Sequence, residues 1–260
     1  MVDGIYAIGV AYDDRSGARR FHINGTGFVA YYSNALWTNA HVVRGVRETV
    51  TGLAGANPKA IAVKAGSHNR GGGWTEYDLG GGHIHPDYDG TNSSPDIGLY
   101  YLPLDADATA LSLLPREYFG GLHEGQPIGT LGFPGELRWG RGDGSVRPTF
   151  KDGTISAIHK FPTHYQIQHN FDVTGGTSGS AIFDHQGWVV AVNHAGFREG
   201  SLDFGIRADE VWEYIECCTR EVALLSPEDT PLGPRLPVRP YPSDTYQPFP
   251  EDWNGETISP

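Results

Sequence analysis

Short runs of apolar and β-branched residues recur along the chain, separated by clusters of Gly, Asp, Asn and Pro. Such runs, bounded by turn-forming residues, are typical of β-strands. A first set of predicted strands covers residues 5–12, 26–32, 35–38, 60–65, 76–84 and 97–102. A second set covers residues 127–133, 152–159, 164–169, 180–184, 187–194 and 203–207. Many short strands without alternating helices predict an all-β fold of barrels or a sandwich, not a parallel sheet.

One segment has the period of a helix. Val211, Ile215 and Cys218 belong to an apolar stripe that predicts a helix over residues 208–224. Acidic residues occupy its first turn, where the helix dipole favours negative charge. From about residue 226 prolines dominate, so residues 226–260 are predicted to form an extended tail or linker.

The spacing of the two strand sets predicts the domain organisation. Residues 103–125 lie between the sets and are expected to connect them. The predicted folded domain covers residues 1–225, with a first barrel at about 5–110 and a second barrel at about 125–207. The helix then follows the second barrel.

Composition excludes some classes of function. The 19 Lys and Arg residues stand against 31 Asp and Glu residues, which gives a net charge of −12. Phosphate binding needs clustered cations, so a nucleic-acid partner is not expected. A membrane-spanning helix needs about 18 or more consecutive apolar residues, and no such run occurs in the sequence, so no membrane partner is expected.

The two cysteines, Cys217 and Cys218, are adjacent and cannot join distant segments. The first residues also lack the basic segment that opens a secretory signal peptide. Both features favour a cytoplasmic location over a secreted one. A removed leader replaced by Met1 would leave the same start, so secretion stays an alternative.

Three polar residues stand in contexts that suit chemistry. His41 follows the apolar run before it and begins a predicted short turn of helix, and Asp96 opens the apolar run 97–102. Ser178 is flanked by glycines in Gly-Gly-Thr-Ser-Gly-Ser-Ala at 175–181. The chain order His, Asp, Ser is one known order of a nucleophilic triad, so the sequence predicts peptide-bond hydrolysis by an activated serine.

Each triad residue has a predicted role. Ser178 is the nucleophile, His41 is the general base and then the general acid, and Asp96 orients the imidazole. Glycines beside the serine allow a sharp turn, so the N–H groups of Gly176 and Ser178 are predicted to form an oxyanion hole.

Simpler interpretations exist for each motif taken alone. A Gly/Ser segment can be only a turn, and a histidine can simply end a strand. Asp87 and Asp89 are rival candidates for the third residue, but both lie in polar turns and neither opens an apolar run. His83 and His85 alternate along one strand, yet no third ligand accompanies them, so no metal site is predicted.

The motifs occur in the order found in one family. The stretches at 25–29, 36–43, 85–88 and 95–99 resemble those of chymotrypsin-like (trypsin-fold) serine peptidases, over about residues 5–224. Within that family the chain resembles the bacterial branch without disulfides, namely glutamyl endopeptidases and high-temperature-requirement proteases. The resemblance implies two perpendicular six-stranded antiparallel β-barrels, with the triad in the cleft between them and no cofactor. It implies a serine endopeptidase that acts on protein or peptide substrates.

Departures from the family bear on regulation and specificity. Thr177 stands where many animal members carry the Asp that pairs with a new N-terminus, so that activation switch is absent. Asp172 lies six residues before Ser178, where trypsins place the acid of their specificity pocket. The resemblance therefore implies cleavage after Arg or Lys. The alternative is a small apolar pocket shaped by Val173 and Asn193, with Asp172 in solvent.

Residues 192–196 are expected to pair with an extended substrate as an edge strand. Asn193 and His194 are accordingly predicted to bind substrate, and Asn193 is also a candidate for holding Asp96. A second hypothesis is that the chain is a protease-fold module of a larger signalling assembly. In that case a regulatory domain or subunit would join through the proline-rich tail.

Overall fold

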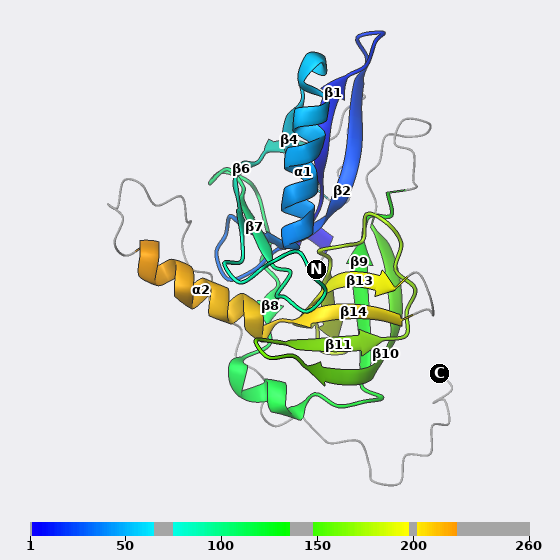
Figure 1. Cartoon of the computed structure of the whole chain (residues 1–260), viewed down its shortest axis with the longest axis vertical. Helices are drawn as coiled ribbons and strands as arrows, with labels where there is room; N and C mark the ends of the chain where they lie inside the picture. The colour runs from blue at the N-terminus through cyan, green and yellow to red at the C-terminus, as the bar shows by residue number, and fades with distance from the viewer. Residues whose placement is uncertain (1, 65–74, 136–147, 198–201, 223–260) are drawn as a thin grey trace.

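Two antiparallel β-sheets, one from each half of the chain, form most of the structure (Figure 1). The computed structural model describes residues 2–64, 75–135, 148–197 and 202–222. The predicted proline-rich tail at 226–260 lies outside the described residues.

The N-terminal half is a seven-stranded sheet in the order β5-β4-β1-β2-β3-β7-β6. Its strands are β1 (Ile5–Asp13), β2 (Arg19–Val29), β3 (Ala35–Thr38), β4 (Lys59–Lys64), β5 (Glu76–Asp78), β6 (Gly80–Ile84) and β7 (Gly98–Tyr101). Short 3₁₀ turns, η1 (Val2–Gly4) and η2 (Ala54–Ala56), precede β1 and β4. Within the described part of the chain, β5 and β6 do not pair with each other, so this sheet stays open.

The C-terminal half is a closed barrel. Six strands follow in the order β12-β9-β10-β11-β14-β13, and the β12–β13 pairing closes the ring. They are β9 (Pro127–Gly132), β10 (Thr149–Lys160), β11 (Tyr165–His169), β12 (Ala181–Asp184), β13 (Trp188–Phe197) and β14 (Leu202–Arg207). The short β8 (Ser112–Leu113) adds to β13 in parallel, and η3 (Arg116–Gly121) follows it.

The predicted all-β fold is confirmed, and a closed six-stranded barrel together with a half-barrel sheet is consistent with the predicted two-barrel arrangement. The N-terminal half nevertheless has seven strands in an open sheet, because the predicted run 76–84 divides into β5 and β6. Strand β2 begins at Arg19, well before the predicted start at residue 26. Its first residues are largely exposed, but Phe21 and Ile23 alternate with polar residues and pack against the core, and the segment pairs with the end of β1.

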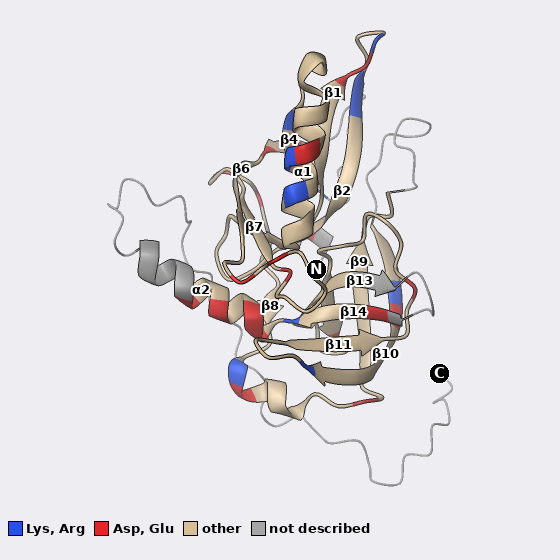
Figure 2. Ribbon diagram, viewed as in Figure 1, with Lys and Arg blue, Asp and Glu red and all other residues tan. Residues whose placement is uncertain are grey.

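Helix α1 (Ala40–Gly52) is much longer than the predicted turn after residue 40. Its Val42, Val43 and Val46 are buried against the sheet, with Val50 packed alongside. This helix covers the outer face of the N-terminal sheet, and β1 is consequently buried on both faces. Figure 2 colours residues of both charge signs along α1, and Arg44, Arg47 and Glu48 are exposed, so they mark its solvent side.

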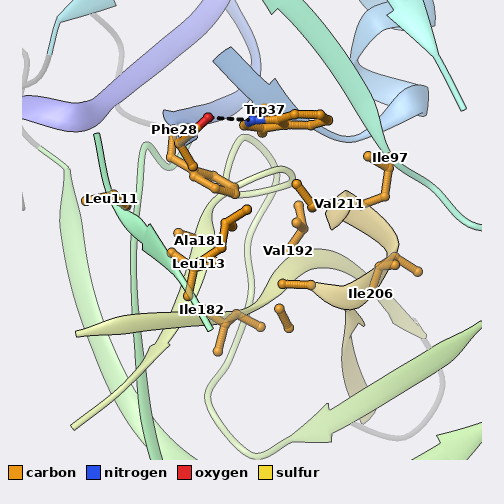
Figure 3. Packing of buried hydrophobic residues seen from close by; sticks show 14 of the residues in the cluster. Phe28, Trp37, Ile97, Leu111, Leu113, Ala181, Ile182, Val192, Ile206 and Val211 are labelled. Carbon is orange, nitrogen blue, oxygen red and sulfur yellow. Dashed lines mark hydrogen bonds between the residues drawn. The ribbon is translucent and has the colours of Figure 1, made fainter. Parts of the chain in front are cut away.

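The core continues from one sheet to the other. In Figure 3, Phe28 and Trp37 of the N-terminal sheet face Ala181, Ile182 and Val192 of the C-terminal barrel. The buried indole N–H of Trp37 donates a hydrogen bond to the carbonyl of Ala30 at 3.0 Å. This shared apolar packing fixes the two halves against each other.

Helix α2 (Asp209–Val222) ends the described chain and agrees with the predicted helix at 208–224. Val211 and Ile215 are buried as predicted, whereas the side chain of Cys218 is outside the described part. Tyr214 packs edge-on against Trp37, with ring centroids 5.8 Å apart. Among the described residues, no helix is long and apolar enough to cross a membrane.

Glu210, in the first turn of α2, is an acid with only 3% of its surface exposed. Burial, reinforced by the charges of Asp209 and Glu213, raises the pKa of the Glu210 carboxyl to about 8. The folded state therefore holds a proton that the unfolded chain releases near its ordinary pKa of 4.5. The contribution of Glu210 to the free energy of unfolding is therefore most favourable below pH 4.5, and this contribution is lost as the pH rises toward 8.

We expect Glu210→Gln to be more stable than the parent by about 2–4 kcal/mol at pH 8, with little difference at pH 4. The measurement is chemical denaturation of both proteins at several pH values. Glu216→Gln, on the exposed side of the same helix and not among the charges that raise the pKa of Glu210, is the control and should leave the pH dependence in place. A stability difference for Glu210→Gln that does not change with pH would contradict this assignment.

Candidate active site

Asp96 lies just before β7 and its side chain is completely buried. Oδ1 accepts the backbone N–H of His41 at 2.8 Å, and Oδ2 accepts Nδ1 of His41 at 2.5 Å. Oδ2 also lies 2.6 Å from Nδ1 of His194. The backbone carbonyl of Asp96 accepts Nδ2 of Asn39 at 2.8 Å. Three segments that are far apart in the sequence therefore meet at this carboxylate.

Asp96 also completes the start of helix α1. The first N–H groups of a helix lack partners inside it, and a nearby anion suits the positive end of the helix dipole. Asn39 occupies the N-cap position, yet its side chain makes no cap hydrogen bond because its amide reaches Asp96 instead. The carboxylate of Asp96 thus caps α1 from outside and fixes His41 on the first turn.

Hydrogen bonding keeps Asp96 ionised. Burial by itself would raise the pKa of the Asp96 carboxyl, but the N–H bonds from His194 and His41 outweigh burial and lower it. A carboxylate that accepts two imidazole bonds is therefore a fixed negative charge in the site. The side chain of His41 remains 39% exposed, so the other side of its ring is open to a substrate.

Ser178, the candidate nucleophile, stands in a tight loop between β11 and β12, and we call residues 174–180 of it the nucleophile loop. Gly176 and Gly179 have φ values of +93° and +86°, a backbone conformation that favours glycine. A Cβ at Gly179 would lie 2.2 Å from Oγ1 of Thr38, and a Cβ at Gly176 would lie 2.4 Å from the carbonyl of Phe133. The two glycines are thus needed both for the turn and for its close approach to neighbouring backbone.

Hydrogen bonds from β13 hold this loop. The N–H of Gly179 donates to the carbonyl of Asn193 at 2.8 Å, and Nδ2 of Asn193 donates to the carbonyl of Thr177 at 3.0 Å. Asn193 was predicted to help hold Asp96, and it holds Thr177 instead. The side chain that contacts Asp96 belongs to the next residue, His194.

Thr26 of β2 joins the nucleophile loop to the N-terminal half. Its hydroxyl donates to the carbonyl of Gly176 at 2.8 Å and accepts the N–H of Phe133 at 2.9 Å. Its own N–H donates to the carbonyl of Ser178 at 2.8 Å. Because Thr26 is fully buried, these bonds are shielded from water and fix the loop relative to β2.

The hydroxyl of Ser178 rests near the carbonyl of His194, at 3.4 Å. Within the described residues it makes no hydrogen bond to His41, although catalytic bonds are often long before substrate binds. The backbone N–H groups of Gly176 and Ser178 have no hydrogen-bond partner in the part of the chain that the structure describes. They are therefore available to an incoming oxygen.

The residues predicted to read the substrate side chain lie beside this loop. Asp172 is exposed, and its backbone carbonyl accepts Nζ of Lys151 at 2.6 Å. Val173 is half-buried against the core, and its N–H donates to Oδ2 of Asp203 at 3.3 Å. Burial, together with the charge of Asp172, raises the pKa of the Asp203 carboxyl. Two carboxylates thus lie near each other just ahead of the nucleophile loop.

The rival acids lie outside the cluster around His41. Asp87 and Asp89 are both exposed. Oδ1 of Asp89 accepts hydrogen bonds from the N–H and the hydroxyl of Thr91, and these bonds stabilise a local turn.

His41, Asp96 and His194 are also a candidate metal cluster, since their ligand atoms lie within 4.8 Å of one another. The N–O separations of 2.5 and 2.6 Å are hydrogen-bond lengths. Two ligands around a tetrahedral zinc ion stand roughly 3.3 Å apart, given Zn–N and Zn–O distances of about 2.0–2.2 Å. The cluster is therefore arranged to share protons, not to hold an ion.

Sequence reasoning missed three contributors to this site: Thr26, Asn39 and Asp203. Thr26 and Asn39 stand inside motifs that were noted only for their order along the chain. Asp203 gave no local signal, because its position beside Val173 depends on the pairing of β14 with its neighbours.

Comparison with known proteins agrees with this architecture. The family model described as the trypsin-like peptidase domain matches residues 25–192. A search of curated protein sequences found no match. Among solved structures, the chain is similar to the crystal structure of Deg5, with a TM-score of 0.57 and 18% identity over 82% of this chain and 87% of that one. It is also similar to the HtrA-type protease AlgW with a decapeptide, with a TM-score of 0.56 and 20% identity over 83% of this chain.

The match spans 64% of that AlgW chain, less than two thirds of its length. The family match, in contrast, covers more than half of this chain, so the chain belongs to the trypsin-like peptidase domain family. It is a serine endopeptidase with the trypsin fold, and the corresponding prediction from sequence is confirmed.

The Thr26 bonds generate a prediction. Thr26→Val keeps the volume but leaves the N–H of Phe133 and the carbonyl of Gly176 without their partner, at a cost of about 1–3 kcal/mol. We expect a lower thermal unfolding midpoint. We also expect reduced peptidase activity at temperatures well below that midpoint, because the carbonyl of Gly176 loses its hydrogen bond from Thr26. Thr26→Ser, which keeps the hydroxyl, should restore most of both. Equal behaviour of the Val and Ser variants would show that the hydroxyl does not position the loop.

Proposed function

We propose that this endopeptidase cleaves peptide bonds through an acyl-enzyme formed on Ser178. The observation that carries the proposal is the double contact of His41 with Asp96, one through the backbone N–H and one through Nδ1. An ionised carboxylate only accepts hydrogen bonds, so Nδ1 of His41 carries the proton. Nε2 of the neutral ring is then left as the base.

The reaction follows from that tautomer. His41 Nε2 removes the proton of Ser178 as Oγ attacks the scissile carbonyl carbon, and the carbonyl π electrons move to the oxygen. The N–H groups of Gly176 and Ser178 stabilise the resulting oxyanion. As the C–N bond breaks, the protonated His41 gives its proton to the leaving amine. Water, activated by the same imidazole, then hydrolyses the ester and releases Ser178.

A binding surface for the peptide lies on β13. Strand β12 pairs with β13 only as far as Val192, whereas residues 195–197 of β13 pair with β14. Within the described residues, the other edge of this end of β13 carries no strand. An extended peptide can add there by backbone hydrogen bonds, which supports the predicted role of residues 192–196.

For specificity, we propose a preference for Arg or Lys before the cleaved bond. Asp172 and Asp203 place two acids ahead of the nucleophile loop, where Lys151 contributes one positive charge, and this excess of acids suits a cationic side chain. Because Asp172 is exposed, its share of the attraction is screened by water and salt. Asp203, which is 8% exposed, is the better shielded of the two acids.

Ser178→Ala tests the nucleophile. We expect hydrolysis to fall by a factor on the order of 10⁶ with no change in the fold, and labelling by a fluorophosphonate probe to disappear. Ser180→Ala is the matched control, because Ser180 is fully buried and bonded to Thr130 and Thr177. It should keep its labelling. Loss of labelling in the Ser180 variant alone would overturn the assignment.

Asp172→Asn tests the specificity. We expect kcat/KM for Arg and Lys peptides to fall about 3–10-fold, as for an exposed and screened charge, with a larger loss in Asp203→Asn. Peptides with Ala or Leu at that position serve as the internal control and should change little. A library cleavage profile dominated by Ala, Val or Leu, unchanged in both variants, would instead favour the small apolar pocket.

A further inference from the structure

His194 contacts both ends of the triad. Its Nδ1 lies 2.6 Å from Oδ2 of Asp96, and its backbone carbonyl accepts the hydroxyl of Ser178 at 3.4 Å. His194 belongs to the C-terminal barrel, whereas Asp96 and His41 belong to the N-terminal half. His194 therefore contacts Asp96 through its side chain and Ser178 through its backbone.

A β-bulge directs the His194 side chain. The register of β13 against β14 shifts between Asn193 and Ala195, so His194 is the extra residue of the bulge. A bulge interrupts the alternation of a strand and re-aims a side chain. As a result Asn193 turns to Thr177 while its neighbour His194 turns to Asp96.

The two imidazoles share one oxygen. Both Nδ1 atoms lie at hydrogen-bond distance from Oδ2 of an ionised carboxylate, so both must carry protons. A neutral His194 then has its lone pair on Nε2, which is buried and has no partner among the described residues. His194 is only 6% exposed, so this nitrogen cannot exchange protons with a substrate.

We propose that His194 is a positioning residue, whose Nδ1–H fixes the Asp96 carboxylate in the orientation that receives His41. This role rests on the proposed function of the triad. Without the bond, Oδ2 of a buried carboxylate loses one of its two side-chain donors, and the carboxylate is free to turn away from the imidazole. The population of His41 with the proton on Nδ1 and Nε2 directed at Ser178 then falls.

The test uses the shape of the side chain. His194→Asn keeps an amide donor at the position of Nδ1, whereas His194→Leu fills a similar space without a donor. We expect His194→Leu to lower kcat about 10–100-fold with KM nearly unchanged, and His194→Asn to recover most of the loss. Thermal unfolding of both variants identifies any that fails to fold.

Proton NMR supplies a readout independent of activity. The parent should show two far-downfield imidazole N–H resonances, one from each histidine bonded to Asp96. One should vanish in His194→Leu, and the other should vanish in His41→Ala. Two resonances that both persist in His194→Leu would overturn the proposal, and so would a parent spectrum with only one resonance that His194→Leu retains. A folded Leu variant with the parent kcat, or an Asn variant as slow as Leu, would also overturn it. Failure of the triad itself is distinguishable, because Ser178→Ala would then retain hydrolysis.

Discussion

The buried charge of Asp96 is the interaction on which the site depends. A carboxylate removed from water is stable only where enough donors surround it, and here they come from the start of α1 and from β13. The same carboxylate caps α1, so the helix and the imidazole of His41 are positioned by one group. Misplacing Asp96 would therefore disturb the local fold and the chemistry together.

The nucleophile loop depends on a second set of bonds across the two halves. Thr26 reaches Gly176 and Ser178 from β2, while Asn193 secures Thr177 from within the barrel. Behind these polar contacts, Phe28 and Trp37 pack on the barrel core. The apolar packing between the two halves thus holds the site rigid, and the hydrogen bonds from Thr26 and Asn193 fix the position of the nucleophile loop.

Local signals in the sequence were enough for the fold class, and they also indicated the three residues that we propose as the triad. Apolar runs marked most strands, and Asp96 was distinguishable from Asp89 because it opens a buried strand. The alternation of side chains along a strand was a poor guide at the β13 bulge and where α1 covers the sheet. The contact with Asp96 that was expected of Asn193 is made by His194, the extra residue of the bulge. The length of α1 was underestimated although Val43, Val46 and Val50 recur at a helical spacing, because β-branched residues directly after a strand also fit a strand ending.

The central claim is that Asp96 is ionised and holds both histidines as Nδ1–H tautomers. Neutron diffraction from a deuterium-exchanged crystal tests it most directly, because the method locates the exchangeable protons. The account predicts deuterium on Nδ1 of both His41 and His194, and none on the carboxyl oxygens of Asp96. Deuterium on Asp96, or on Nε2 in place of Nδ1 of His41, would contradict it.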